Sequence, residues 1–131
     1  MAKAKQITVW VESKPGDLGR IGKALGDAKV NITAFVAYGA SGESPIRLQV
    51  SSPAKAKKVL QGLGFRFTEE EVLRLTLPDK PGILGEAGSR LGAANINIEY
   101  GYATVAKGGK KADVTLGVSD LAGATKALRG I

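Results

Sequence analysis

The sequence predicts an α+β protein made of two copies of one β-α-β-β-α-β unit, and two observations lead to this prediction. The first is an internal repeat, in which residues 6–38 align with residues 72–104 at a shift of 66 and share 12 identical residues. The second is that apolar residues in each copy alternate, then follow helical spacing, then alternate again. With 131 residues, the chain has room for one ordinary domain or two very small ones.

The repeat is clearest at a Lys-Pro-Gly turn. Residues 14–19 read Lys-Pro-Gly-Asp-Leu-Gly and residues 80–85 read Lys-Pro-Gly-Ile-Leu-Gly, and the same shift superposes Asn31 on Asn97. Beyond Tyr38 the register slips to 68, which predicts a hairpin two residues longer in the second copy. We therefore divide the chain into repeat 1, residues 1–67, and repeat 2, residues 70–131.

The elements of repeat 1 follow from its periodicities. Ile7, Val9 and Val11 alternate with other side chains, which predicts a strand with one buried face. After the Pro-Gly turn, helical spacing predicts a helix over residues 18–28. Strands are predicted at 30–38 and 46–50, a helix at 53–60, and a short closing strand at 65–67. Three glutamates at 69–71 are expected to form a linker.

Repeat 2 has the same order of elements. We expect a strand at 73–77, a helix at 84–94, strands at 96–105 and 113–118, and a helix at 121–128. This order is the split βαβ motif of ferredoxin-like folds, with an antiparallel sheet and its helices on one face. A unit of about 65 residues is only marginally stable alone. Because the linker is short, we expect the two copies to pack side by side.

Composition excludes most enzyme classes. The chain has no cysteine and no histidine, which removes disulfides, thiolate nucleophiles and the commonest general base and metal ligand. We therefore expect no catalytic residue, no metal and no cofactor, and a protein that is not an enzyme. Apolar runs are far shorter than the roughly 20 residues that cross a bilayer, and the N-terminus lacks the apolar block of a signal peptide. The expected location is the cytoplasm.

The strand, the Lys-Pro-Gly-x-Leu-Gly turn, the helix and the following Asn-Ile together resemble the ACT domain, a regulatory module with a ferredoxin-like fold. Both copies match, so the resemblance covers nearly the whole chain. It implies binding of small effectors, most often amino acids, at interfaces between paired domains. The chain is similar to free-standing tandem ACT proteins, which implies a regulatory role and a protein target still to be identified.

The turn also has a physical reading that needs no family. Proline presets φ and glycine permits a close backbone approach, so the turn delivers a helix whose first N–H groups lack partners. An effector carboxylate is expected on the N–H groups near Asp17, Leu18 and Gly19, and water on those groups is the alternative.

The resemblance adds further site residues. It implies that an asparagine binds the effector from across the interface, and that polar residues two positions before each proline contribute. We expect each asparagine to lie beside the N-terminus of the first helix of its copy. As an alternative, the asparagines and the polar residues before the prolines serve only as turn residues. The candidate ligand-binding residues are therefore Ser13, Gly16, Asp17, Leu18 and Asn31 in repeat 1, and Asp79, Gly82, Ile83, Leu84 and Asn97 in repeat 2.

One departure from the resemblance affects the expected effector. Relatives that bind serine carry a histidine four residues before the proline, where this chain has Val11 and Leu77. We therefore expect the pocket to favour an apolar effector side chain or to be empty.

Glycine is in excess, and six of its residues form two helical stripes. Each interior glycine costs a helix about 1 kcal/mol relative to alanine, so we expect another group to approach these stripes closely. Two partners are considered, the sheet of the same unit and a helix of the other. The stripe residues are Gly19, Gly22 and Gly26 in repeat 1, and Gly85, Gly88 and Gly92 in repeat 2.

Two other function classes remain as alternatives. Net charge is +7, and residues 1–66 carry the whole excess, with Lys55, Lys57 and Lys58 as the densest cluster. Nucleic-acid binding by this basic repeat is one alternative, although its strands lack the aromatic RNP1 pattern. A protein interaction module with degenerate ligand sites is the other.

Assembly is predicted from the outward face of the first sheet. If Ile7 and Val9 face the helices, then Thr8, Trp10 and Glu12 face outward beside Phe35. An exposed aromatic patch of this kind usually marks an interface. We expect a homodimer in which this face, including Trp10, is covered by the partner.

Overall fold

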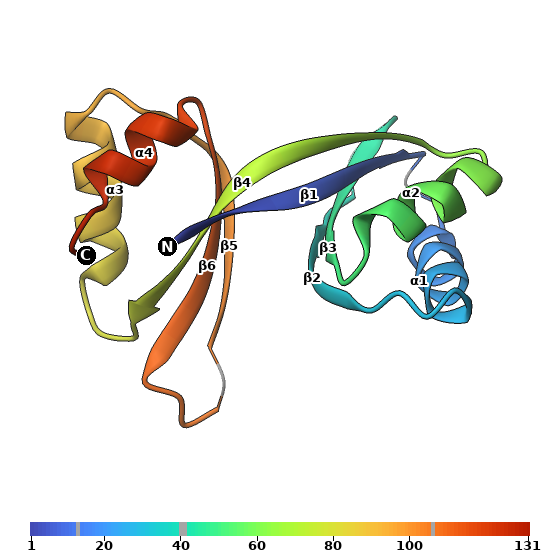
Figure 1. Ribbon diagram of the computed structural model, residues 1–131, viewed down its shortest axis with the longest axis horizontal. Helices are drawn as coiled ribbons and strands as arrows, with labels where there is room; N and C mark the ends of the chain where they lie inside the picture. The colour runs from blue at the N-terminus through green and yellow to red at the C-terminus, as the bar shows by residue number, and fades with distance from the viewer. Residues whose placement is uncertain (13, 40–41, 106) are drawn as a thin grey trace. The chain divides into compact units, whose positions relative to one another are not determined.

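The computed structural model describes residues 1–12, 14–39, 42–105 and 107–131 (Figure 1). The chain forms two compact units. The first unit comprises residues 5–70, and the second unit comprises residues 1–4 together with residues 71–131. The N-terminal residues 1–4 therefore belong to the unit that contains repeat 2.

The first unit is a four-stranded antiparallel sheet with two helices on one face (Figure 1). Its strand order is β2-β3-β1-β4, which is the ferredoxin-like order. The elements are most of β1 (Ala2–Val11), α1 (Asp17–Asp27), β2 (Ile32–Ala37), β3 (Ser44–Val50), α2 (Pro53–Gly62) and the start of β4 (Arg66–Pro78).

The second unit repeats this order with one difference at its edge. It contains the rest of β4, then α3 (Ile83–Ala93), β5 (Ile98–Val105), β6 (Lys111–Val118) and α4 (Leu121–Ala127). Its strands follow the order β4-β6-β5, and the start of β1 is the neighbour of β4 on the other side. In the first unit the equivalent edge place, beside β1, is taken by residues 66–70. The predicted ferredoxin-like fold class is confirmed.

Each unit has its own apolar core between sheet and helices. In the first unit, the alternating residues of β1 pack against Ile21 and Leu25 of α1 and Leu60 of α2. In the second unit, Leu73, Leu75 and Leu77 of β4 occupy the equivalent places. Burying one such side chain contributes roughly 1.5–3 kcal/mol, so these alternating residues fix which face of each sheet carries the helices.

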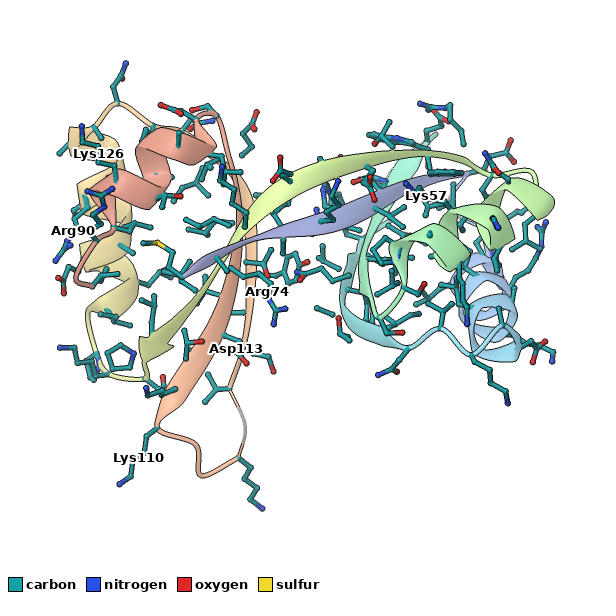
Figure 2. The ribbon with its side chains drawn as sticks, viewed as in Figure 1. Lys57, Arg74, Arg90, Lys110, Asp113 and Lys126 are labelled. Carbon is teal, nitrogen blue, oxygen red and sulfur yellow. The ribbon has the colours of Figure 1, made fainter. Side chains whose placement is uncertain are left out.

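The two units also share their irregular features, a register shift in the sheet and a hydrogen bond between the helices. The register of β2 against β3 shifts between Ile32 and Ala34, and that of β5 against β6 shifts between Ile98 and Tyr100. An arginine ties the two helices of each unit: Arg20 of α1 donates to the Leu63 carbonyl at 3.2 Å, and Arg90 of α3 donates to the Arg129 carbonyl at 2.8 Å (Figure 2).

The expected linker at residues 69–71 is wrong, because these glutamates lie inside the 13-residue strand β4. Basic and polar groups of the first unit hold them there. Glu69 pairs with Lys5 at 3.7 Å and with Lys57 of α2 at 3.4 Å (Figure 2). Glu70 accepts hydrogen bonds from the Thr8 hydroxyl and from Gln6 Nε2. The acidic run is therefore strand, and side chains of the first unit bind the carboxylates of Glu69 and Glu70.

Two further expectations need correction. Thr8 is buried, with only 2% of its surface exposed, and Trp10 is half-buried under the guanidinium of Arg66, so the outward face is partly covered by the chain itself. Apart from the chain neighbours and the backbone of the same helix, no atom of the described residues lies within 4 Å of a Cβ built at any of the six stripe glycines. Close packing of these stripes on the sheet of the same unit is therefore wrong.

Candidate functional site

Both Pro-Gly turns deliver a helix with unpaired N–H groups. Gly16 and Gly82 are the N-caps of α1 and α3, with φ of 93° and 87°, a left-handed conformation that favours glycine. Neither helix has a side-chain cap. Among the described residues, the N–H groups at 18–19 and 84–85 have no backbone acceptor outside their helices. Each helix therefore presents the positive, donor-rich end that the sequence predicts.

The side chains around the two turns differ in exposure. Leu18 and Leu84 are 40% and 66% exposed, whereas Ile83 packs partly against the core of the second unit. Asp79 is exposed, and its N–H donates to the Lys110 carbonyl at 2.8 Å. Ser13, the remaining predicted turn residue, lies outside the described residues.

The structure places the two asparagines away from the turn of their own unit. Helix α1 begins at Asp17 and ends at Asp27, and Asn31 comes only after it. Eleven helical residues span about 16 Å, so Asn31 and the Pro-Gly turn lie at opposite ends of the helix. Asn97 has the same relation to α3. The expectation that each asparagine lies beside the first helix's N-terminus is therefore wrong.

What holds the asparagines is the same in both units. The Asn31 N–H donates to Ser51 Oγ at 2.9 Å, and the Ser51 N–H donates to the Asn31 carbonyl at 2.9 Å. Asn97 makes the same pair of bonds with Ser119, both at 3.0 Å. Both asparagines are exposed. Their backbones are fixed, and their side chains face solvent, where a group from outside the unit can meet them.

The N-terminal end of α1 also borders two cavities of the first unit, one of about 290 Å³ and one of about 250 Å³. Asp17 lines both, although only 5% of its surface is exposed. The larger one, called here the Trp10 cavity, is lined by Trp10, Val11, Glu12, Lys14, Asp17, Glu43, Gly64, Phe65 and Arg66. Sequence reasoning selected Asp17 for its backbone N–H and missed its buried side chain.

The wall of the Trp10 cavity is organised by Arg66. Its guanidinium lies 5.2 Å from the centre of the Trp10 ring, a cation–π distance, and its Nη2 is 2.6 Å from Glu43 Oε1. Arg66 comes from the start of β4, Glu43 from the segment before β3, and Trp10 from the end of β1. Three segments distant in sequence therefore build one wall.

The charge distribution does not single out a nucleic-acid surface. Residues 5–70 carry ten basic and six acidic side chains, and residues 1–4 with 71–131 carry nine and six, so both units are similarly basic. Lys57, from the predicted cluster, is paired with Glu69. Within the described part of the chain, no group of three or more acidic, histidine or cysteine residues is arranged to hold a metal ion. No helix there is long and apolar enough to cross a membrane.

Two ferredoxin-like units, each with a glycine-capped helix after its first strand, define the class of paired ACT-type regulatory domains. A family model described as an ACT domain pair matches residues 2–120, and the chain belongs to this family. No curated protein matches the sequence significantly.

Solved structures show the same architecture. Protein BT0572 from Bacteroides thetaiotaomicron superposes with a TM-score of 0.88 at 27% identity, covering 97% of this chain and 87% of that one. The ligand-free regulatory subunit of aspartate kinase from Thermus thermophilus gives 0.69 at 14% identity, covering 98% and 94%. The corresponding subunit from Thermus flavus gives 0.66 at 12%, covering 96% and 92%. The last two likenesses concern the fold alone.

Proposed function

We propose that this protein is a non-catalytic regulatory protein that binds an amino acid at interfaces involving its ACT-type units. The observation that carries the proposal is the doubled glycine-capped helix end, with unpaired N–H groups, in a chain that belongs to the ACT domain pair family. An α-carboxylate fits such an end because the donors and the helix dipole both favour an anion. Regulatory subunits of aspartate kinase are among the solved proteins that share this fold.

The positions of the asparagines bear on where the ligand lies. Since Asn31 and Asn97 are at the far ends of their own helices, a site that joins a turn to an asparagine needs the asparagine of another unit or another chain. We therefore keep the homodimer as part of the proposal. Phe35 of β2 and the nearby Tyr38 are 52% and 53% exposed, and they provide apolar surface for such an interface.

Thermal-shift screening against the twenty amino acids tests this function. A ligand that binds only the native state stabilises it by RT ln(1 + [L]/Kd), about 2.7 kcal/mol at a hundredfold excess over Kd. We expect one amino acid, or a chemically related group, to raise the Tm in a concentration-dependent way. If none does so at millimolar concentration, the amino-acid function is wrong and the interaction-module alternative takes its place.

Calorimetry on variants then tests the site. We expect Asn31→Ala with Asn97→Ala to weaken binding of the amino acid found in the screen, while the far-UV circular dichroism is unchanged. Lys58→Ala, an exposed change on α2, serves as the control. Unchanged affinity in the double variant would remove both asparagines from the site.

A further inference from the structure

The side chain of Asp17 has a buried oxygen without a donor. Only 5% of the residue is exposed, and among the described residues Asp17 Oδ2 has no hydrogen-bond partner. A buried carboxylate oxygen is unfavourable unless a donor or cation meets it. The positive end of α1 favours the negative charge of Asp17, but it supplies no hydrogen bond to this oxygen. The side chain is therefore built to accept a group from outside the unit.

A second unpaired group belongs to another residue that lines this cavity. Trp10 Nε1 is buried and has no acceptor among the described residues. Its ring is fixed by Arg66, which is itself held by Glu43. An indole N–H donates only, so it requires an oxygen or nitrogen acceptor. Two residues that line the Trp10 cavity thus each have a buried group without a partner, an acceptor on Asp17 and a donor on Trp10.

The charges around the cavity favour a cation. Its lining includes the carboxylates of Glu12, Asp17 and Glu43 against the basic groups of Lys14 and Arg66. Arg66 is committed to Glu43 at 2.6 Å. The exposed Lys14 forms no ion pair with Asp17 within the described part of the chain. A small molecule with an ammonium group therefore meets a net negative lining and a waiting carboxylate.

We propose that the Trp10 cavity recognises the ammonium group of the effector, with Asp17 Oδ2 accepting from it and Trp10 Nε1 donating to an oxygen of the same molecule. The inference rests on the proposed function, because it assigns the amine of the proposed amino acid to this cavity. It predicts discrimination against N-acylated and keto analogues, which lack the ammonium group.

The cavity belongs to one repeat only. At the shift of 66, Ile83 occupies the place of Asp17 and Thr76 the place of Trp10. Repeat 2 therefore has the glycine-capped helix end without the amine-binding groups. One amine-selective site per chain is expected.

The unique tryptophan gives a direct readout, because its indole N–H produces a single nitrogen–proton NMR signal in the full chain. We choose glycine and methylammonium as ammonium-bearing probes, and N-acetylglycine as the probe without the ammonium group. Glycine and methylammonium are expected to shift the Trp10 signal, and N-acetylglycine is expected to leave it in place. An unmoved signal with all ammonium probes would overturn the inference.

Two variants separate the effect of the Asp17 charge on binding from a general effect on the fold. Asp17→Asn keeps the shape and removes the charge, and we expect it to weaken glycine and methylammonium binding at least tenfold. Asp27→Asn, at the exposed end of the same helix, is the matched control and is expected to leave binding unchanged. Equal binding by the two variants would overturn the assignment of Asp17, and tenfold weaker binding by Asp17→Asn alone would support it.

The outcomes also separate this inference from the proposed function. If an amino acid raises the Tm but does not shift the Trp10 signal, and if Asp17→Asn does not weaken its binding, the function stands and the cavity assignment fails. If methylammonium shifts the signal through Asp17 while no amino acid binds, the cavity assignment stands and the amino-acid function fails.

Discussion

Among the described residues, two that are not glycine adopt the left-handed conformation, and they lie at matching helix ends. Lys29 has φ of 62° and Asn95 has φ of 58°, each two residues after the end of its helix. In both, the N–H of the next residue returns to a helix carbonyl, from Val30 to Leu25 and from Ile96 to Leu91, each at 2.9 Å. Asparagine tolerates this conformation, whereas lysine has no side-chain compensation for it. Repeat 1 therefore carries strain that repeat 2 avoids.

Exchanging these residues tests that strain. We expect Lys29→Asn to raise the free energy of unfolding by about 0.5–1 kcal/mol, because asparagine enters the left-handed region more readily. The reverse change, Asn95→Lys, is expected to lower it by a similar amount. Urea denaturation measures both, and an equal effect of the same sign in the two variants would contradict the explanation.

At this scale the sequence predicts backbone better than side-chain surroundings. The Pro-Gly pairs correctly predict that a helix follows each turn, because proline and glycine act through local sterics. Asp17 lines one cavity together with Trp10, Phe65 and Arg66, and only the folded sheet brings these residues near it. The local sequence pattern does not show which distant residues the fold brings near Asp17, so its carboxylate could not be identified as a site group from the sequence.

At the scale of elements, the glycine stripes of α1 and α3 face open space, so packing within the unit does not explain them. A helix interior glycine without a close neighbour lowers stability and has no packing role within its own unit. Gly22 and Gly88 lie in the middle of α1 and α3, where this penalty is largest. If the stripes have a packing partner, it is therefore a helix of another unit or another chain.

Alanine at the mid-helix glycines distinguishes these cases. We expect Gly22→Ala and Gly88→Ala each to raise the free energy of unfolding by about 1 kcal/mol, because a Cβ meets nothing within 4 Å. Urea denaturation gives the stability, and sedimentation at micromolar concentration gives the assembly state. Loss of stability together with loss of a dimer would instead place the stripes in the interface between chains.

Strand β6 contains a glycine that a neighbouring side chain requires. A Cβ at Gly117 would meet the Tyr100 ring of β5, which lies across from it. In repeat 1 the same cross-strand place pairs Gln49 with Ala34. In both units a large residue faces a small one across the two strands. The large residue is on β3 in the first unit and on β5 in the second, so the position of the large side chain has moved from one strand to its neighbour.

This exchange predicts a compensating pair. Gly117→Ala alone is expected to displace the Tyr100 ring and to lower the free energy of unfolding by about 1–2 kcal/mol, since overpacking forces side chains from their preferred positions. Adding Tyr100→Ala should recover part of that loss. A double variant no more stable than Gly117→Ala alone, measured by thermal unfolding, would refute the compensation.

For the whole molecule, the repeat alone predicts the order of nearly every element, since each period is local. Two segments were missed for the same reason. The alternating Ala-Lys start of β1 has too few apolar residues to predict a strand, and residues 69–71 are too acidic. Both become strand because β1 and β4 are neighbours in the sheet, although about 65 residues separate them in the chain.

Removing residues 1–4 tests the part they play in the second unit. They line a cavity of about 230 Å³ together with Arg74, Leu75, Thr76 and Asp113, two of which are labelled in Figure 2. Without them the outer edge of β4 has unpaired backbone groups. We expect faster amide hydrogen exchange over residues 73–77 and a lower Tm, with Lys3→Gln as a control that keeps the strand. Unchanged exchange in the truncated chain would show that the edge does not depend on these residues.

The assignment of residues 1–4 to the second unit also sets an order of events during synthesis. Residues 1–4 belong with a strand that is made about 70 residues later, so they have no place in the sheet until β4 has emerged. Residues 5–70 have all their own strands by then and can fold first. Residues 1–4 are thus among the last segments to reach native pairing, and until then proteases and chaperones can reach their unpaired backbone groups.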